Sequence, residues 1–400
     1  MAFMGGNLFG SFILGFIGDT WGRKIVMYIG AVLLFGSSLG CAWANSFIFF
    51  VVLRFIAGAA TTSGIGSLMI IMFETVDPAH RSHATVAVEV SWCLGEIILS
   101  GAAYFIRDWR SLQIAISCPG GILLLYWLFV PESARWLLSK GKGVKAMKIV
   151  QRAAYMNKRQ PHIDAKEVKL EQRKSWNELL PLFQSCRLFV RFMVIAMLWF
   201  ILSLSYYGLT FNVGRIGNNA YLEFIIYAVL EMVAYVSCLF INTRLGRKPL
   251  NIGAFLLAGV ACISSTLISR YADGDNDWLI IVLSAIGRMG VSATFANAFV
   301  YTGELFPTTI RSFILACTNV ATRTGAIISP YLTESGTNKG GGLGYTSLIF
   351  GVLTLAAGIV SCFLPETLNT SLPDNIDDMD GRRKQQFAQK NDDTLIATVL

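Results

Sequence analysis

Charged side chains stand within or near long apolar stretches of this sequence. They are Arg54, Glu89, Glu96, Glu223, Glu231, Arg288 and Arg323. A charge is costly to bury in an apolar surrounding, so each of these residues is a hypothesis for function. A buried guanidinium offers a planar fork of donors that fits a carboxylate, and a buried carboxylate attracts an ammonium group. These residue types therefore predict the binding of small organic ions; the alternative is that they pair with one another and hold helices together.

A second charged pattern, GDTWGRK at residues 18–24, separates two apolar stretches and returns in part as LGRK at 245–248. Asp19 is placed to end one helix, and Arg23 and Lys24 are placed to begin the next. An acid and two cations at helix ends can pair with each other or with a neighbouring helix terminus. The pattern therefore predicts a contact that fastens helix ends on one side of the molecule.

The composition indicates an integral membrane protein. Of the 400 residues, 54% are hydrophobic and 14% are charged, whereas soluble domains carry about 25% charged residues. The mean hydropathy is +0.56. The net charge of +8 is interpreted through its distribution among loops, and nucleic acid is not expected as a partner. The eight cysteines show no metal-ligand spacing and are interpreted as buried thiols; His80 and His83 are interpreted as loop residues, so no metal site is expected.

Apolar runs of about 20 residues are long enough to cross the hydrocarbon core of a bilayer as helices. Eleven segments are interpreted as spans, at 1–17, 25–43, 46–73, 84–106, 112–130, 188–211, 221–242, 250–269, 278–303, 312–333 and 343–364. An odd number of spans places the two termini on opposite sides of the membrane.

Lysine and arginine divide unevenly between the two sides. The loops on the side of 131–187 and the tail hold 24 of them, and the loops on the other side hold 5. Without the long loop the division is still 11 to 5. The positive-inside rule places the richer side in the cytoplasm. We therefore expect a multi-pass protein with its N-terminus outside and its C-terminus inside the cell; the plasma membrane is the expected location.

Three motif pairs recur in the same order at nearly the same offset. WGRK at 21–24 returns as LGRK at 245–248, ETVDPAHR at 74–81 as ELFPTTIR at 304–311, and PES at 131–133 as PET at 365–367. The offsets are 224, 230 and 234 residues. Each motif ends or begins a span on the predicted cytoplasmic side. The chain is therefore interpreted as two copies of one helical unit, separated by the long loop.

The two copies are unequal, because the second has two spans before its LGRK and the first has one before its GDTWGRK. A span is thus missing from the front of the first copy. Truncation of the chain is the favoured interpretation, and a protein that dispenses with this helix is the alternative. The predicted domains are an N-terminal bundle of five spans at 1–130, a cytoplasmic linker loop at 131–187, a C-terminal bundle of six spans at 188–364 and a cytoplasmic tail at 365–400.

Together these motifs resemble those of a known family. Two parallel helical repeats joined by a cytoplasmic linker describe the major facilitator superfamily, and GDTWGRK resembles its signature. PESARWL at 131–137, ELFPTTIR at 304–311 and LPET at 364–367 resemble marks of solute-carrier family 22. AYFIRDWR, GRMG and FVYTGELFP look especially like its organic cation and carnitine branch. The resemblance implies an all-α fold of two bundles, about eleven membrane helices, and transport by alternating access around a midplane site, with no covalent chemistry.

The resemblance also implies substrate-binding residues. Arg323 stands at a position where the resemblance implies an arginine in anion and carnitine members. Glu231 matches a membrane glutamate of the cation branch, and Glu89 matches a polar position that faces the cavity. Aromatic residues at positions that resemble cavity-facing ones are Trp199, Tyr206, Tyr207, Tyr227 and Phe295. An aromatic face attracts a quaternary ammonium by ~1–2 kcal/mol when both are desolvated. Packing within the bundle is the alternative for all of them, and Arg54 and Arg288 are interpreted as structural or gating residues.

A group of charged residues and one glycine at the cytoplasmic helix ends is predicted to form the gate. It comprises Asp19, Gly22, Arg23, Lys24, Glu74, Arg81, Glu132, Arg135, Arg247, Glu304 and Arg311. Gly18 and Gly22 are expected to permit the tight turn between the first two helices. The hypothesis is that Asp19 and the cations latch the cytoplasmic side when the carrier faces outward. Thr243 stands in the second copy where Asp19 stands in the first.

The loop and the tail carry two further predictions. Residues 143–155 place apolar side chains at 144, 147, 149, 150 and 154 with cations between them, which predicts an amphipathic helix on the inner leaflet. The chain ends in Thr398-Val399-Leu400, which fits a PDZ domain as a partner. KGKG at 140–143 lacks the rest of a phosphate loop, so no nucleotide or other cofactor is expected. The sequence does not determine whether Na+ or H+ is coupled to transport.

Three functions remain open at this stage, and none of them is enzymatic. The first is transport of an organic cation or of a zwitterion such as carnitine. The second is transport of organic anions, which Arg323 favours. The third is a truncated isoform that does not transport and acts by binding partners.

Overall fold

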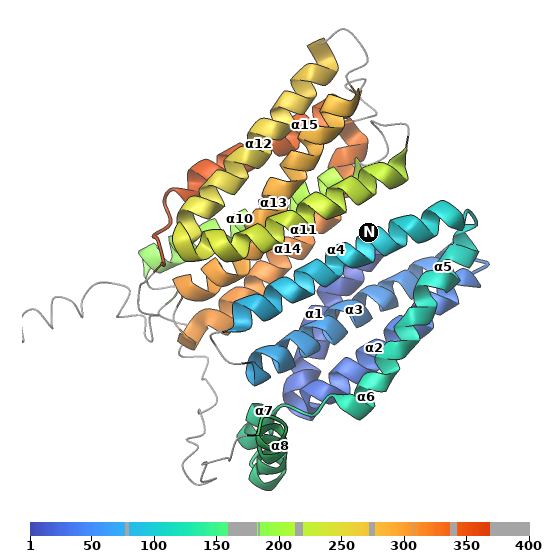
Figure 1. Cartoon of the computed structure of the whole chain (residues 1–400), viewed down its shortest axis with the longest axis vertical. Coiled ribbons are helices and arrows are strands. Elements are labelled where there is room, and N and C mark those ends of the chain that lie inside the picture. Colours follow the sequence, from blue (N-terminus) through green and yellow to red (C-terminus); the bar gives the residue numbers. More distant parts are fainter. Residues whose placement is uncertain are drawn as a thin grey trace, which may run out of the picture. The chain divides into compact units, whose positions relative to one another are not determined.

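The computed structural model describes residues 1–76, 80–158, 182, 185–212, 219–271, 277–306, 308–336 and 342–368. Almost all of these residues are helical, and no strand occurs among them. Figure 1 shows the helices along the chain from blue to red. An all-α fold is what the resemblance implied, and the described part of the chain confirms it.

Each apolar segment of the first half lies on a helix or on consecutive helices. These are α1 (Ala2–Trp21), α2 (Arg23–Ala42), α3 (Phe47–Thr75), α4 (Arg81–Phe105) and α5 (Trp109–Ser117), which continues into η2 (Cys118–Leu125) and α6 (Tyr126–Phe129). Apolar runs of this length fold as helices because every backbone donor and acceptor is then bonded within the segment.

The fifth predicted span, 112–130, differs from the prediction in its start and in its regularity. It begins at Trp109, because Asp108 caps the helix by accepting hydrogen bonds from the backbone nitrogen and the hydroxyl of Ser111, at 2.9 and 2.7 Å. These hydrogen bonds lower the pKa of the Asp108 carboxyl. The α-helix then tightens into a 3-10 helix at Cys118, where Pro119 has no backbone N–H to donate.

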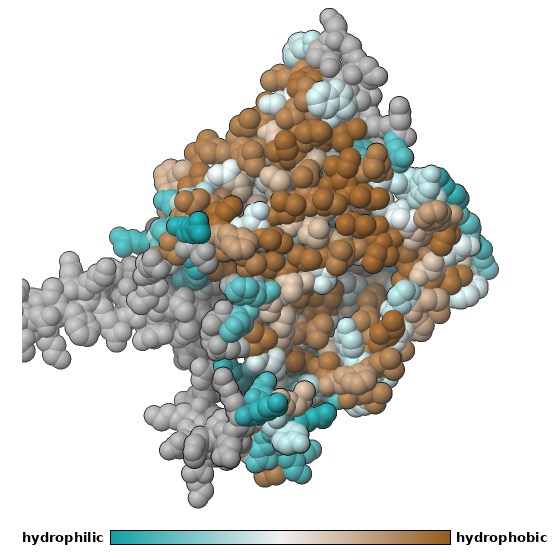
Figure 2. Space-filling view, viewed as in Figure 1, coloured by the Kyte–Doolittle hydropathy of each residue, from teal (hydrophilic) through white to brown (hydrophobic). Residues whose placement is uncertain are grey.

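The second half supplies six more helices that match the predicted segments. They are α10 (Cys186–Phe211), α11 (Ala220–Arg244), α12 (Arg247–Tyr271), α13 (Asp277–Leu305), α14 (Thr308–Gly336) and α15 (Gly342–Ser361). Among the described residues, eight segments, with 109–129 counted as one, are long and apolar enough to cross a membrane. Figure 2 shows apolar side chains spread over the outer faces of the helices, as a bilayer requires.

The long loop contains two short helices in its described part. They are α7 (Ala134–Ser139) and α8 (Gly143–Met156), so the helix predicted at 143–155 is confirmed. Ser133 caps α7 by accepting a hydrogen bond from the backbone nitrogen of Trp136 at 3.1 Å. The two helices pack on each other through Trp136, Leu137 and Ala146.

Contacts divide the chain into two compact units. The first comprises residues 1–172 and 218–232, and the second comprises 173–217 and 233–400. The division falls within α11, so the N-terminal half of this helix packs with the first unit. The domain boundaries at 130, 187 and 364 stay a prediction.

The same close crossing of helices occurs in both units. A Cβ atom added at Gly30 of α2 would lie 2.9 Å from the Cα of Gly64 in α3. At the equivalent crossing of α12 and α13, a Cβ atom added at Gly290 would lie 2.7 Å from the carbonyl oxygen of Ala254. Small residues allow membrane helices to approach this closely. The repeat seen in the motifs therefore extends to the packing of the helices.

The helices α4 and α14 hold equivalent places in the two copies but differ in burial. In the second unit α14 packs on α10 through Gly325, beside the carbonyl oxygen of Phe200. The first copy, as given, begins with the equivalent of α11. Only 11% of the apolar span of α4 is buried, whereas Ile314, Ala326 and Ser329 of α14 are all buried.

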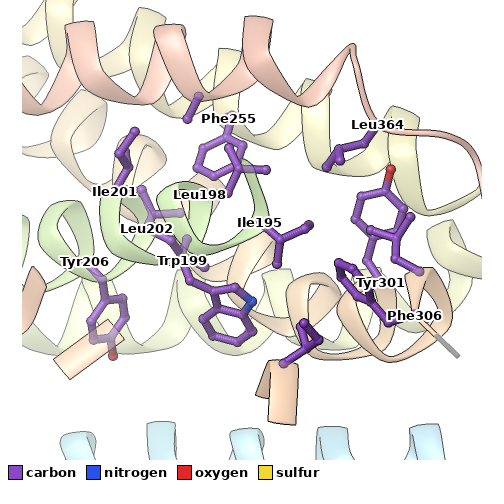
Figure 3. Packing of buried hydrophobic residues seen from close by; sticks show 14 of the residues in the cluster. Ile195, Leu198, Trp199, Ile201, Leu202, Tyr206, Phe255, Tyr301, Phe306 and Leu364 are labelled. Atoms are coloured by element: carbon purple, nitrogen blue, oxygen red, sulfur yellow. The ribbon is translucent and has the colours of Figure 1, made fainter. Parts of the chain in front are cut away.

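A large apolar core lies in the second unit. Figure 3 shows its side chains converging from α10, α12, α13 and the segment after α15. Ile195, Leu198 and Leu202 of α10 face Phe255 of α12, and Tyr301 donates a hydrogen bond to the carbonyl oxygen of Pro365 at 2.7 Å. This core fixes α10 and α13, which carry Trp199, Tyr206, Tyr207 and Phe295.

The prediction that all eight cysteines are buried is wrong for part of the set. Cys118, Cys186 and Cys362 are exposed, and Cys317 is half-buried. For Cys118, Cys317 and Cys362 the reason is that an apolar stretch in a membrane protein has an outward face as well as an inward one. Cys186 is the first residue of α10 and precedes the apolar stretch.

Candidate functional site

A carboxylate caps the start of α12 in the second unit. Glu366 follows the last span and accepts hydrogen bonds from the backbone nitrogens of Arg247 and Lys248, at 3.0 and 3.1 Å. The first N–H groups of a helix have no partner within the helix, and the helix dipole favours negative charge there. Gly246 precedes this helix with a φ of +97° and lies directly against the carboxylate.

The first unit repeats this arrangement with Glu132. Its carboxylate accepts hydrogen bonds from the backbone nitrogens of Arg23 and Lys24, at 3.0 and 3.1 Å. Gly22 has a φ of +119° and lies against the same carboxylate. Gly18, which was expected to share this turn, lies inside α1 and is buried. The turn thus depends on Gly22, because only glycine adopts a positive φ without steric cost.

An ion pair joins the start of α12 to the end of α13. Arg247 Nη2 lies 3.0 Å from Glu304 Oε1, and the two side chains are about one-fifth exposed. Arg247 Nη1 also donates to the carbonyl oxygen of Asn242, and Glu304 Oε2 accepts a hydrogen bond from the Thr367 hydroxyl at 2.6 Å. The predicted gating residues Arg247 and Glu304 are therefore brought together, beside the Glu366 cap.

The equivalent residues of the first copy are arranged differently. Glu74 stands where Glu304 stands, and its Oε2 is buried with no hydrogen-bond partner among the residues that the structure describes. Lys24 lies with its ammonium 4.6 Å from the centre of the Trp127 ring. Arg135 is exposed on α7. The side chains of Asp19, Arg81 and Arg311 lie outside the described residues, so the predicted latch at Asp19 stays a prediction.

Two opposing effects act on the pKa of Glu366. Burial alone raises it, but the backbone N–H groups of Leu368, Arg247, Thr367 and Lys248 stabilise the charged form, and together they lower the pKa below its usual value. The carboxylate is therefore charged at neutral pH, as a helix cap requires.

The candidate substrate-binding aromatics of the second unit form one cluster. The ring of Trp199 lies 5.5 Å from that of Phe295, Tyr206 lies 6.0 Å from Phe295, and Tyr207 lies 5.4 Å from Tyr206. Phe299, which sequence reasoning did not single out, lies 4.7 Å from Trp199. Phe299 is one helical turn after Phe295, and this i, i+4 spacing on α13 was the available signal.

Arg288 lies against this cluster. Its side chain is fully buried, and its guanidinium carbon lies 5.0 Å from the centre of the Tyr206 ring. It donates hydrogen bonds to the hydroxyls of Thr210 and Tyr206, at 3.1 and 3.4 Å. These contacts favour the structural interpretation of Arg288, and they occupy one face of the Tyr206 ring with a cation that belongs to the protein.

Arg323 lies on α14, beside the contact between α14 and α10. The carbonyl oxygen of the preceding Thr322 accepts a hydrogen bond from the Ser203 hydroxyl at 2.6 Å. Arg323 is half-buried, and its Nε is buried with no hydrogen-bond partner among the described residues. A donor in this state is available to an anionic group of a ligand.

Acidic side chains gather on the N-terminal half of α11 and on α4 in the first unit. Glu231 is fully buried, and Glu223 is 2% exposed and accepts a hydrogen bond from the Tyr227 hydroxyl at 3.3 Å. Glu89 of α4 is half-buried and lies within electrostatic range of Glu231. Two carboxylates that share an apolar surrounding favour a cation between them or a proton on one of them.

Arg54 has partners within the first unit. It donates to the side-chain oxygen of Gln113 on α5 at 3.1 Å and lies over the ring of Phe50. Gln113 in turn donates to the carbonyl oxygen of Ser38 at 3.0 Å. These contacts tie α2, α3 and α5 together and favour a structural role for Arg54.

A small cavity opens beside Trp199 in the second unit. It holds about 10 Å³, which is room for roughly one water molecule. Polar groups of Asn251, Thr294 and Thr302 line it, and the Trp199 ring nitrogen donates to the Thr302 hydroxyl at 3.0 Å. The cavity is too small for an organic ion, so Trp199 contacts protein here.

Residues 1–377 match the family described as "Sugar (and other) transporter". An organic cation transporter protein from Drosophila melanogaster is 32% identical over 97% of this chain and 72% of its own length. Solute carrier family 22 member 13 from Homo sapiens is 33% identical over 94% of this chain and 68% of its own length. Organic anion transporter 3 from Homo sapiens is 32% identical over 94% of this chain and 70% of its own length.

The fold is also similar to solved structures. A structure of the proton:xylose symporter XylE gives a TM-score of 0.70 at 21% identity, covering 93% of this chain and 86% of the symporter. An inward open conformation of the same transporter gives 0.71 at 20% identity, with the same coverage. At this level of identity the likeness shows the fold alone, which is that of a major facilitator transporter.

Proposed function

Since the chain belongs to the "Sugar (and other) transporter" family of the major facilitator superfamily and to solute-carrier family 22 within it, we propose that it carries small organic cations or zwitterions across a membrane by alternating access. In this mechanism the binding residues are exposed first to one side of the membrane and then to the other. Transport by this route forms and breaks no covalent bond.

The observation that carries the proposal is the aromatic cluster of the second unit. Tyr206 and Trp199 of α10 gather with Phe295 of α13, and Arg288 lies against Tyr206. Aromatic faces bind quaternary ammonium groups when water is excluded. Arg288 covers one face of the Tyr206 ring. The aromatic faces left for a substrate are therefore chiefly those of Phe295, Phe299 and Tyr207. Phe299 is 45% exposed, so its ring is open to a ligand or to lipid.

A zwitterion such as carnitine is the proposed substrate, because each unit offers a buried charge and the two charges differ in sign. In the first unit Glu231 is a fully buried carboxylate that suits an ammonium group, and Glu89 and Tyr227 belong to the same unit. In the second unit Arg323 has a buried donor without a partner among the described residues, which suits a carboxylate. A guanidinium fits a carboxylate through two parallel hydrogen bonds.

Transport of organic anions is the second candidate. Arg323 and Arg288 supply two guanidinium groups on α14 and α13, and the relatives include one named organic anion transporter 3. An aromatic carboxylate would place its ring on the aromatic cluster and its charge on Arg323.

Competition experiments separate the two candidates. The chain is reconstituted in liposomes, and uptake of labelled carnitine is measured with tetraethylammonium or an aromatic carboxylate as competitor. The cation proposal expects inhibition by tetraethylammonium and loss of uptake in Glu231→Gln. Inhibition by the aromatic carboxylate alone, with uptake of that anion lost in Arg323→Ala, contradicts it and supports the anion candidate. A folded chain with no uptake of any of these compounds supports a role in partner binding instead.

The plasma membrane is the proposed location. The N-terminus is proposed to lie outside and the C-terminus in the cytoplasm, on the distribution of lysine and arginine. An epitope at each end, probed in intact and permeabilised cells, tests this orientation. The terminal Thr398-Val399-Leu400 is proposed as a PDZ ligand, and binding that survives Leu400→Ala would contradict it.

A further inference from the structure

The hairpin of α7 and α8 carries an unbalanced positive charge. Between residues 133 and 158 the sequence contains seven lysines and arginines and no aspartate or glutamate. The cations are Arg135, Lys140, Lys142, Lys145, Lys148, Arg152 and Lys158. Figure 2 shows hydrophilic residues gathered over α7 and α8, whereas apolar residues cover the neighbouring helices. A charge of this size on one small element points to an anionic partner.

The apolar side of α8 is already occupied within the protein. Ala146 is buried, and Ile149 packs with Leu138 against Trp136 and Leu137 of α7. The amphipathic pattern at 143–155 therefore describes packing on α7, and this apolar side is not available to a bilayer. What α8 turns outward is its opposite side.

The outward side of α8 forms a cationic stripe. Lys145, Lys148 and Arg152 are all exposed and follow one another at helical spacing. Apolar side chains extend the stripe at both ends, because Val144 is 76% exposed and Tyr155 is 86% exposed. Cations with flanking apolar and aromatic side chains are the composition of a helix that lies on a membrane surface.

The hairpin follows the fifth span directly and therefore lies near one end of the membrane helices of the first unit. α7 begins five residues after α6 ends the fifth span, at Phe129. Glu132, between them, caps the start of α2, and Trp136 of α7 lies beside Gly22 at the turn between α1 and α2. Figure 1 shows α7 and α8 at one end of the helices of the first unit.

We propose that the stripe formed by Val144, Lys145, Lys148, Arg152 and Tyr155 docks on a leaflet of anionic lipid. A cluster of four to eight lysines and arginines directly after a membrane span binds anionic lipid, and each cation strengthens the binding about fivefold. The docking is mainly electrostatic, because α7 covers the apolar side of α8. It holds α7 against the turn at Gly22. In the cell, docking on anionic lipid rests on the proposed orientation of the chain, since anionic lipids are concentrated in the cytoplasmic leaflet.

The test uses the full chain in lipid nanodiscs, which present the same lipid on both faces, so that neither orientation nor transport affects the result. A Tyr155→Cys variant carries a fluorophore, in a background where the exposed Cys118, Cys186 and Cys362 are replaced by serine. Lipids that carry a nitroxide quench the fluorophore more strongly the closer it lies to the membrane, so quenching reports docking. The expected result is strong quenching in phosphatidylcholine with phosphatidylserine, weak quenching in phosphatidylcholine alone, and loss of the difference at about 1 M salt.

Two variants sharpen the test. The triple variant Lys145→Gln, Lys148→Gln, Arg152→Gln should weaken docking on the order of 100-fold, whereas the matched variant Lys145→Arg, Lys148→Arg, Arg152→Lys should dock like the parent. Equal quenching with and without phosphatidylserine would overturn the proposal, as would an unchanged signal in the glutamine variant. Displacement by soluble glycerophosphoserine would show that the stripe binds a free phosphate and would also overturn it.

Discussion

Arg247 and Glu304 form an ion pair in which Nη2 and Oε1 lie 3.0 Å apart, at the junction of α12, α13 and the segment after α15. Glu304 also accepts a hydrogen bond from Thr367, and the backbone nitrogen of Arg247 donates to Glu366. The pair therefore connects the first residues of one helix, the last residues of another and the residues that follow a third. A substitution at any of these residues should therefore change the contribution of the others to the free energy of unfolding.

Removal of Glu304 should destabilise the second unit. The pair is about one-fifth exposed, so Glu304→Ala is expected to lower the free energy of unfolding by about 1 kcal/mol, as measured by thermal unfolding in detergent. Glu74→Ala, the equivalent change in the first copy, should cost less because Glu74 Oε2 has no hydrogen-bond partner among the described residues. The account is wrong if Glu304→Ala and Thr367→Ala have fully additive effects.

Alanine at the two turn glycines should destabilise each unit. Gly22 and Gly246 have φ values of +119° and +97°, where a side chain costs about 1–2 kcal/mol, and a Cβ atom there would also press on the carboxylate that caps the next helix. Gly36→Ala and Gly253→Ala are matched controls, because a Cβ atom at either meets nothing within 4 Å. Both controls should leave stability unchanged or raise it slightly. Equal effects in the two pairs would contradict the assignment.

The Glu366 cap should make stability depend on pH. The pKa of Glu366 is lowered in the folded chain, so its contribution is fully present above the unfolded value of about 4.3 and is lost as pH falls through the folded value. Wild type and Glu366→Gln should therefore differ in stability at neutral pH and converge in acid. A difference between the two unfolding midpoints that is constant down to about pH 3 would show that the carboxylate does not act as a charged cap.

The ring of Tyr206 should matter more than its hydroxyl. Arg288 lies 5.0 Å from the ring centre, whereas its hydrogen bond to the hydroxyl is long, at 3.4 Å. Tyr206→Phe should cost under about 1 kcal/mol, and Tyr206→Leu should cost about 2 kcal/mol more because the buried cation loses its aromatic partner. Unfolding in detergent measures both. A larger loss in Tyr206→Phe than in Tyr206→Leu would refute this order.

The membrane helices could be predicted from the sequence because the bilayer demands long apolar runs. Each of the eleven predicted segments lies on helical structure. Two of the motif pairs give equivalent contacts, because Glu132 and Glu366 cap α2 and α12 in the same way, whereas Glu74 and Glu304 of the third pair are arranged differently. The break at Cys118 was not predicted, although Pro119 was its signal. Hydropathy averages over a window and does not show where an α-helix tightens.

The candidate site was less predictable, because its contacts join residues that are far apart in the chain. Glu366 was noticed as part of a repeat, but its hydrogen bonds to Arg247 and Lys248 depend on how α12 meets the segment after α15. Arg288 was expected to be structural or gating, and its place over Tyr206 could not be read from either segment alone. The predicted roles of Arg323 and Glu231 in binding stay predictions.

Uptake of carnitine by the purified chain in liposomes tests the central claim most directly. The account predicts saturable uptake that exceeds that of empty liposomes, that tetraethylammonium inhibits, and that falls at least tenfold in both Glu231→Gln and Arg323→Ala, a loss of about 1.4 kcal/mol or more in binding. Gly36→Ala should transport like the parent. Uptake equal to that of empty liposomes, from a chain shown to be folded by its unfolding transition, would contradict the account.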